Sequence, residues 1–324
     1  MFRSFASLLV IVGGAMQLFG GAPAYAQDKV RIFSGTDEHW VQLQVAKARG
    51  FFAKEGLDVE LTVFTTGATA TEAFRAGRGD FISAGDLPSA AMWKTGAAIG
   101  IAPMSSDTEI FGIISTKGIN SPKDLRGKKV ATRMGSTGEF LVHRYLATAG
   151  MTAKDVNLID LAPPEMVISM VRGDIDAFAW LAPFTTRAVT TGKNAKLLTT
   201  AKGLANNRII MSVTPSFRDK NPEAVRKVLR AVRQGTEFTR SNPEEATKIW
   251  ASAVQGKPEQ SLPVVRLIAY DMTFSKAFIA DMDELAKFMV QKGALKGPIN
   301  WQKEMDTSFL RTVDAKLVAA SAGK

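Results

Sequence analysis

One phrase of sequence occurs twice in the chain and constrains its architecture more than any other feature. In EAFRAGRGDFISAGD, residues 72–86, a helical run ends at Gly77 and Asp80 leads into the apolar FISAG. In MVISMVRGDIDAFAW, residues 166–180, a helical run ends at Gly173 and Asp176 leads into AFAW. Glycine accepts the left-handed conformation that ends a helix, and an uninterrupted apolar run suits a covered parallel strand. The repeat therefore predicts two copies of one α/β folding unit.

Both copies also contain the tripeptide Arg-Gly-Asp, which is known from cell-adhesion loops, at residues 78–80 and 172–174. The tripeptide stands in a different register in each copy, because Arg78 follows the helix-ending glycine whereas Arg172 precedes it. The two copies share the folding unit, but the Arg-Gly-Asp tripeptide does not occupy the same position within it. We therefore interpret the tripeptide as a coincidence.

The rest of the chain continues the alternation of strands and helices. Strands are predicted at residues 29–33, 57–64, 127–134 and 156–161, and helices at residues 41–50, 140–150 and 163–173. Such alternation is typical of parallel sheets with helices on both faces. In these sheets the ligand crevice lies beyond the carboxyl ends of the strands, so the loops at that edge carry the candidate site.

The first 26 residues have the features of a cleavable secretory signal peptide. Met1–Arg3 is a short basic start, residues 5–14 are apolar, and Ala24-Tyr25-Ala26 is a cleavage site of small residues. We therefore expect export to the periplasm. No other run approaches the roughly 18 apolar residues that a membrane-spanning helix requires.

The remaining chain is expected to form two lobes. Residues 27–115 and 213–324 are assigned to lobe 1, and residues 116–212 to lobe 2. The helical tail after the second unit has no sheet of its own to cover, so it is expected to pack back on lobe 1. This division predicts two connections between the lobes, near Ile113–Ser115 and near Met211–Thr214. Closure of the lobes about such a double hinge is the expected motion.

Loops of lobe 1 at the predicted crevice supply several candidate ligand contacts. Glu38, His39 and Trp40 offer a charge, a hydrogen bond and a flat stacking surface. Trp40 alternatively belongs to the core. The next loop contributes Gly85, Asp86 and Ser89, although Asp86 or Ser89 alternatively caps the helix that follows. Residues 66–69 have similar chemistry, and their place relative to the crevice is left open.

Lobe 2 supplies the predicted anion site. Gly135, Ser136 and Thr137 precede a helix, where hydroxyl groups and free backbone N–H groups bind an anion without a cationic side chain. A plain helix cap at Ser136 or Thr137 is compatible with that role. Trp180 and Pro183 follow the repeated phrase and are expected to line the opposite wall, with a core position as the alternative for Trp180.

The composition excludes several kinds of chemistry. The absence of cysteine excludes disulfides, thiol catalysis, iron–sulfur clusters and cysteine-rich zinc sites. The chain has two histidines, His39 and His143, without the pattern of carboxylates that a metal site needs. Gly135-Ser136-Thr137-Gly138 matches neither a phosphate-binding loop nor a nucleophile elbow. We therefore expect a binding protein with no catalytic residue, metal or cofactor.

The charge of the chain does not favour nucleic acid as a partner. The formal net charge is +10 at pH 7, but the positive residues are scattered. The densest run, residues 126–129, is short and has no interleaved aromatic residues.

Several phrases, taken in order, carry a resemblance to a known family. They are GDLP at residues 85–88, KDLRGKKVA at 123–131, GST at 135–137, LAPPEMVISMVRGDIDAFAWLAP at 161–183, NPEAVRKVLRAV at 221–232 and NPEEATKIW at 242–250. With these phrases the chain resembles the periplasmic substrate-binding proteins of the taurine, aliphatic sulfonate and nitrate ABC transporter family. Receptors for thiamine precursors belong to the same superfamily.

The resemblance implies a fold and a function. The implied fold is a bilobal type II periplasmic binding protein, an α/β protein with two parallel-rich sheets joined by a two-segment hinge. The implied function is capture of a small organic anion, a sulfonate or a carboxylate, by a monomer that delivers it to an ABC permease. Docking on a sensor kinase or chemoreceptor is an alternative. An enzyme like the thiamine-pyrimidine synthases is a second alternative, although the cysteine- and histidine-rich features of that branch are absent.

The chain departs from the family pattern where ligands are selected. The family usually has Trp directly before the final [AD]-P pair, whereas this chain has Leu181 there and Trp180 one position earlier. The pair itself is Ala182-Pro183, so the aspartate of some members is absent. The resemblance therefore extends to the anion loops and leaves the identity of the ligand open.

Overall fold

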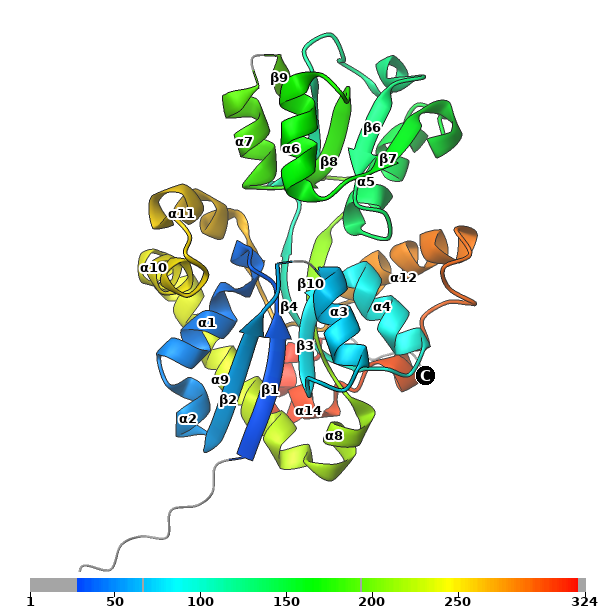
Figure 1. Cartoon of the computed structure of the whole chain (residues 1–324). Coiled ribbons are helices and arrows are strands. Elements are labelled where there is room, and N and C mark those ends of the chain that lie inside the picture. The colour runs from blue at the N-terminus through cyan, green and yellow to red at the C-terminus, as the bar shows by residue number, and fades with distance from the viewer. Residues whose placement is uncertain (1–27, 66, 193, 320–324) are drawn as a thin grey trace, which may run out of the picture.

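The computed structural model describes residues 28–65, 67–192 and 194–319. The predicted signal peptide, residues 1–26, lies outside the described residues. The described chain forms two lobes, each built around its own sheet, and two segments of chain run between them (Figure 1). The predicted α/β class with two sheets is confirmed.

The sheet of lobe 1 has the strand order β11-β4-β10-β3-β1-β2. β1 pairs with β2 and β3 in parallel, as the alternation of strands and helices predicts. The strands of this sheet are β1 (Asp28–Ser34), β2 (Leu57–Val63), β3 (Phe81–Gly85), β4 (Ile99–Asp107), β10 (Asn207–Val213) and β11 (Ala269–Tyr270).

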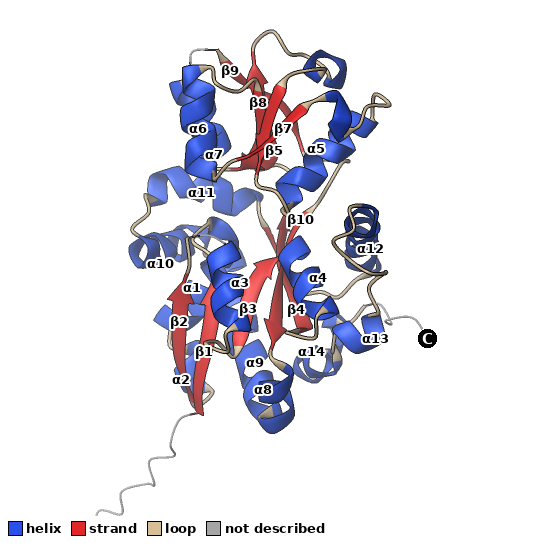
Figure 2. Ribbon diagram, turned by 45° about the vertical axis from the view of Figure 1, so that its right-hand side comes forward, coloured by secondary structure: helices blue, strands red, loops and turns tan. Residues whose placement is uncertain are grey.

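Helices cover both faces of this sheet, with α1, α2 and α9 on one face and α3 and α4 on the other (Figures 1 and 2). The helical tail packs on lobe 1 as predicted, because Val228 and Leu229 of α9 share a buried core with Ile32 and Leu43. The helical elements of lobe 1 are η1 (Glu38–Trp40), α1 (Val41–Ala48), α2 (Phe51–Lys54), α3 (Gly67–Arg75), α4 (Asp86–Lys94), α8 (Pro215–Lys220), α9 (Pro222–Ser241), α10 (Pro243–Val254), α11 (Pro258–Leu267), α12 (Lys276–Gln291), α13 (Trp301–Glu304), α14 (Ser308–Val313) and η4 (Ala315–Leu317).

The sheet of lobe 2 has the strand order β7-β6-β8-β5-β9 and is also covered on both faces. Leu141 and Leu146 of α5 pack on one face, and Met166 of α6 with Ala188 of α7 packs on the other. The elements are β5 (Phe111–Thr116), η2 (Pro122–Leu125), β6 (Lys129–Thr132), α5 (Thr137–Ala147), η3 (Ala153–Asp155), β7 (Asn157–Asp160), α6 (Pro163–Arg172), β8 (Ala177–Leu181), α7 (Phe184–Thr191) and β9 (Ala195–Thr200).

The two connections between the sheets lie earlier in the chain than predicted. β5, which contains the expected hinge Ile113–Ser115, pairs with β8 and β9 of lobe 2. β10, which contains Met211–Val213, pairs with β3 and β4 of lobe 1. The chain therefore crosses at residues 108–110 and 201–206. FGIIST and NRIIMSV each have a short apolar centre that suits either sheet, so their composition does not reveal the lobe to which they belong.

Both sheets are mixed and not purely parallel. β10 runs antiparallel to β3 and β4, and β5 runs antiparallel to β8 and β9. The crossings are the reason, because a strand that arrives from the other lobe enters its sheet from the cleft edge. It must therefore run against the strands that end at that edge.

The repeated aspartate has one structural role in both lobes. The Asp80 carboxylate accepts from the backbone N–H of Arg31 on β1 at 2.9 Å, and the Asp176 carboxylate accepts from that of Lys129 on β6 at 2.8 Å. The backbone N–H of each aspartate donates to the carbonyl of the same partner. The helix-ending glycines Gly77 and Gly173 have φ values of +74° and +81°. The interpretation of the repeat as a folding unit is confirmed.

Apart from the two connections, the lobes contact each other where α5 of lobe 2 meets α12 of lobe 1. We call this contact the α5–α12 seam. The ring centroids of Phe140 and Phe288 are 5.1 Å apart, and Lys292 Nζ lies 2.6 Å from Glu139 Oε1. The lobes are thus held against each other by an apolar contact and a partly buried ion pair in addition to the two connections.

Candidate functional site

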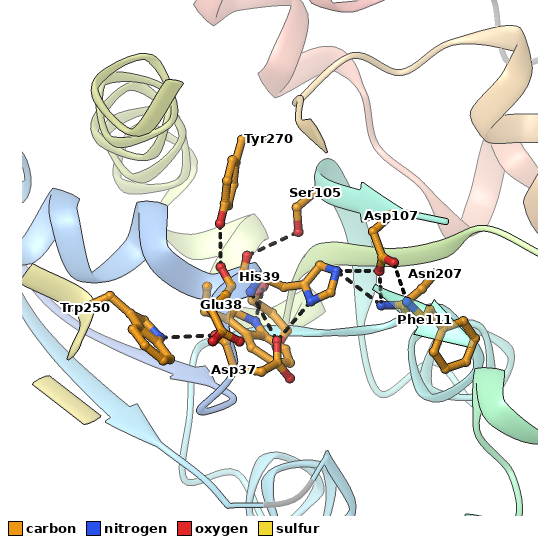
Figure 3. Close-up of polar contacts among 11 residues, drawn as sticks. Asp37, Glu38, His39, Ser105, Asp107, Phe111, Asn207, Trp250 and Tyr270 are labelled. Carbon is orange, nitrogen blue, oxygen red and sulfur yellow. Dashed lines mark hydrogen bonds and ion pairs between the residues drawn. The ribbon is translucent and has the colours of Figure 1, made fainter. Parts of the chain in front are cut away.

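The first predicted loop is a rigid turn whose backbone is held by the rest of lobe 1. Each carbonyl of Asp37, Glu38 and His39 accepts a hydrogen bond from a side chain (Figure 3). The donors are Trp250 Nε1 on α10 at 3.2 Å, Tyr270 Oη on β11 at 2.7 Å and Ser105 Oγ on β4 at 3.1 Å. Two of these donors, Trp250 and Tyr270, lie more than two hundred residues after the turn in the sequence. The C-terminal part of the chain therefore holds the shape of a loop near the start of lobe 1.

The side chain of His39 points from this turn into the protein and is fully buried. Its ring nitrogens contact Asp37 Oδ1 at 3.0 Å and Asp107 Oδ2 at 2.9 Å (Figure 3). Burial alone lowers the pKa of His39, but the hydrogen bonds to Asp107 and Asp37 outweigh burial and raise this pKa to about 10. The imidazole is therefore a cation at neutral pH, bonded to protein at both ends.

Asp107 links the His39 imidazolium to both connections between the lobes through hydrogen bonds. The Asp107 carboxylate accepts from the backbone N–H of Phe111, the first residue of β5, at 3.0 Å. It also accepts from the side-chain amide of Asn207, the first residue of β10, at 3.0 Å (Figure 3). The turn at the cleft edge, the buried imidazolium and the two connections thus form one hydrogen-bonded unit.

Glu38 and Trp40 point into lobe 1. Glu38 is 1% exposed, and burial raises its pKa to about 7, although a hydrogen bond from Ser261 opposes that shift. Among the described residues, its Oε2 atom has no hydrogen-bond partner. Trp40 Nε1 donates to the carbonyl and hydroxyl oxygens of Ser83, and its ring lies against Gly35. The core alternative for Trp40 thus describes its position.

The second predicted loop places Asp86 at the first residue of α4. Its carboxylate accepts from the backbone N–H of Leu87 at 2.7 Å, and its side chain is almost fully buried. Ser89 is completely buried and donates to the carbonyl of Ala84, so it faces the interior of lobe 1. Gly85 directly precedes α4 and is partly exposed.

The third predicted loop caps α5. Ser136 Oγ accepts from the N–H of Gly138 at 3.1 Å, and the N–H of Gly135 donates to Glu139 Oε2 at 2.8 Å. Within the described residues, no acceptor is found for the backbone N–H groups of Ser136 and Thr137. Unpaired N–H groups at a helix start, together with the helix dipole, attract negative charge. The helix-cap role is therefore present, and two donors remain for an anion.

The second and third loops meet across the two lobes. Thr137 Oγ1 donates to Asp86 Oδ1 at 2.5 Å. Burial raises the pKa of Asp86 to about 6, against the lowering effect of its bonds from Thr137, Leu87 and Arg208. The start of α4 and the start of α5 are therefore joined through one carboxyl group.

A cavity of about 320 Å³ extends from Asp86 between the lobes. Phe140 and Arg144 of lobe 2 line one side, and Arg208 and Asp281 of lobe 1 line the other. The guanidinium of Arg208 pairs with Asp281 at 2.5 Å and lies over the ring of Phe278. This volume and mixture of charges suit a small polar ligand. Of the predicted site residues, Asp86 lines this cavity, whereas Ser136, Thr137 and Trp180 do not.

The wall predicted for lobe 2 lies at the same edge of its sheet as α5, because β6 and β8 are parallel neighbours. Trp180 is partly buried and packs against both cores of lobe 2, so the core alternative accounts for part of its surface. Pro183 is exposed and precedes α7. Thr66 lies outside the described residues, and α3 begins at Gly67.

Asp107, Asn207 and Arg208 were not predicted as site residues. All three lie at strand ends next to the connections between the lobes. The available signal for Asp107 was the polar end SSD of the strand IGIAPMSSD, whose first six residues are apolar. Asn207 and Arg208 had no comparable signal, because β10 enters its sheet in the direction opposite to its neighbours.

Within the described part of the chain, no group of three or more histidine, aspartate and glutamate side chains is arranged to hold a metal ion. The same residues contain no helix whose length and apolar character suffice to cross a membrane.

Solved structures with this arrangement define the class of the fold. The periplasmic nitrate-binding protein NrtA of Synechocystis aligns with a TM-score of 0.77 at 16% identity over 92% of both chains. The alkanesulfonate-binding protein SsuA of Xanthomonas axonopodis, bound to MOPS, aligns with a TM-score of 0.74 at 18% identity, over 86% of this chain and 98% of that chain. The chain thus has the fold of the bilobal periplasmic binding proteins.

The chain belongs to the NMT1/THI5-like family, whose model matches residues 38–246. The taurine-binding periplasmic protein of Escherichia coli is 28% identical over 235 residues, which cover 68% of this chain and 71% of that protein. The 4-amino-5-hydroxymethyl-2-methylpyrimidine phosphate synthase THI13 of Saccharomyces cerevisiae is 22% identical over 68% of both chains. The relatives thus support a role in solute binding and include one synthase.

Proposed function

We propose that this protein is the periplasmic solute-binding protein of an ABC importer and captures a small organic anion, a sulfonate or a carboxylate, between its lobes. The observation that carries the proposal is the start of α5, where the N–H groups of Ser136 and Thr137 have no acceptor among the described residues. An acidic group of the ligand accepts from these donors and gains from the helix dipole.

The candidate residues divide into two groups in this proposal. Gly135, Ser136 and Thr137 hold the acidic group, Asp86 and Gly85 face it from lobe 1, and Trp180 and Pro183 cover the carbon skeleton. His39, Trp40 and Ser89 act indirectly, because their buried side chains shape the loops of lobe 1. Glu38 is also buried within lobe 1, so it is proposed to act indirectly on the same loop and not to contact the distal group of the ligand.

The proposal includes a location and a partner. Residues 1–26 direct export and are removed, and the monomeric mature protein binds its ligand in the periplasm. Closure of the two lobes then presents a surface from both lobes to a membrane permease. We propose no catalytic step, because the anion loops lack the nucleophile and phosphate-binding patterns described above.

The experiment is a thermal-shift assay of the mature protein with taurine, butanesulfonate, benzoate and nitrate. A ligand that binds only the folded state raises the melting temperature by mass action. At least one of these anions is expected to raise it in a concentration-dependent manner, and sodium chloride at equal ionic strength is the control. No shift with any anion, up to millimolar concentration, contradicts the proposal.

A further inference from the structure

The start of α5, where the proposed function places the ligand's acidic group, already contacts a carboxyl group of the protein itself. Asp86 Oδ1 accepts from the hydroxyl of Thr137 at 2.5 Å, and Asp86 is 2% exposed. The carboxyl group belongs to the first residue of α4, so it lies at the starts of two helices from different lobes. An ionised Asp86 beside a bound anion places two negative charges close together, and one of them is almost fully buried.

Asp86 has little freedom to move away from this position. Its Oδ1 atom also accepts from the N–H of Leu87 at 2.7 Å, and α4 begins at Asp86 itself. The bonds from Leu87 and Thr137 go to the same oxygen, Oδ1, and Oδ2 is therefore the oxygen that takes up a proton, against the opposing effect of the Arg208 backbone. A protonated carboxyl group donates a hydrogen bond, whereas an ionised one only accepts.

The charged groups around Asp86 do not cancel its charge. Arg208 of β10 is the cation that acts on it, but the guanidinium of Arg208 pairs with Asp281 of α12 at 2.5 Å. Across the same cavity, Arg144 of α5 lies 3.8 Å from Glu284 of α12. Each arginine of the cavity thus has an acid of its own. Burial raises the pKa of Asp86 to about 6, so one proton is already held more tightly than by an exposed aspartate.

We propose that Asp86 is a specificity-determining residue that takes up one proton when an organic anion binds and donates that proton in a hydrogen bond to the anion's acidic group. This inference rests on the function proposed above. The proton comes from solvent and the anion enters unprotonated, so charge balances with one negative charge added and one removed. The site then selects ligands whose acidic group accepts a hydrogen bond.

The proposal makes the affinity depend on pH with a defined sign. Binding requires the protonated form of Asp86, which is most of the free protein below pH 6 and a decreasing fraction above it. The association constant should therefore be nearly flat below pH 5.5 and should fall by up to about tenfold per pH unit above pH 6.5. His143 lies on the next turn of α5, beside Glu139 and Lys292, and its pKa is lowered mainly by burial, so it needs its own control.

Isothermal titration of the mature protein with butanesulfonate, taurine and benzoate at pH 5.5 and 7.5 tests the proposal. Butanesulfonate is the most direct probe, because a sulfonate stays ionised throughout this range. For each probe that binds, the affinity should be about tenfold or more higher at pH 5.5. Titrations at pH 7.5 in two buffers of different ionisation enthalpy should show uptake of close to one proton per anion. This readout uses the unmodified protein, so it does not depend on the folding of a variant.

Asp86→Asn removes the titration and keeps a hydrogen-bond donor. This variant should bind the same probe with equal affinity at both pH values and more tightly than the unmodified protein at pH 7.5. Glu284→Gln, which removes one exposed charge from the same cavity, and His143→Asn should both retain the pH dependence. Equal affinity of the unmodified protein at both pH values, or no proton uptake, overturns the inference and leaves the proposed function intact. Absence of binding by every probe at both pH values overturns the proposed function itself.

Discussion

The hydroxyl group of Thr137 in lobe 2 donates a hydrogen bond to Oδ1 of Asp86 in lobe 1, at 2.5 Å. The bond joins the first residue of α5 to the first residue of α4, so the predicted anion site and a contact between the lobes are one place. Binding at this place and the relative position of the lobes are therefore expected to depend on each other.

Replacement of Ser136 and Thr137 by alanine should weaken anion binding about tenfold while the protein stays folded. The change removes two hydroxyl groups at the site, each worth about 0.5–1.5 kcal/mol as a hydrogen bond, and keeps the backbone N–H groups. Titration with the best anion of the panel measures the effect. Ser275→Ala is the matched control, because Ser275 caps α12 through the N–H of Phe278, away from this loop. Unchanged affinity in the double variant contradicts a contribution of the two hydroxyl groups to anion binding.

His39→Asn should lower the free energy of unfolding by about 3–5 kcal/mol, because it leaves the buried carboxylate of Asp107 without its cation. Urea unfolding at pH 6 measures this loss. His143→Asn is the control and should cost less, because His143 is half-buried and lies 3.8 Å from its nearest acid, Glu139.

The effect of His39 should also depend on pH. Its pKa in the folded protein is raised to about 10, so its stabilising contribution is complete below the unfolded value near 6.5. The contribution is lost as the pH rises from there through the folded pKa. The difference in unfolding free energy between the unmodified protein and His39→Asn should therefore shrink between pH 6.5 and 10. A difference that grows over this range contradicts the assignment of a buried imidazolium.

Asp80→Ala and Asp176→Ala should each destabilise the protein by about 1–3 kcal/mol, because each leaves a strand N–H without its acceptor. Denaturant unfolding measures both changes. Asp174→Ala is the control within an Arg-Gly-Asp triplet, since Asp174 is exposed, and it should change stability by less than about 0.5 kcal/mol. If the control costs as much as the other two, the shared role of the repeated aspartates is refuted.

Phe288→Ala should separate the lobes in the free protein. The change removes the apolar part of the α5–α12 seam, where the rings of Phe140 and Phe288 lie 5.1 Å apart. Small-angle scattering should give a larger radius of gyration for this variant than for the unmodified protein, and a bound anion should reduce it. Val290→Ala, an exposed position on the same helix, serves as the control. An unchanged radius means that the remaining contacts between the lobes hold them together without the Phe140–Phe288 contact.

The local folding units were predictable from the sequence because short-range chemistry determines them. Gly77 and Gly173 end their helices, and Ser136 caps α5, through bonds within a few residues. The connections were misplaced because a buried apolar run fits either sheet, and its partner strand decides which. The environment of His39 was also beyond local reasoning, since Asp107 and Asn207 reach it over sequence separations of 68 and 168 residues.

A crystal structure of the mature protein with a bound anion from the panel tests the central claim most directly. The account predicts that an oxygen of the anion lies within about 3.2 Å of the backbone nitrogen of Ser136 or Thr137, with the carbon skeleton toward Trp180. An anion bound only at a surface distant from the start of α5 would contradict it.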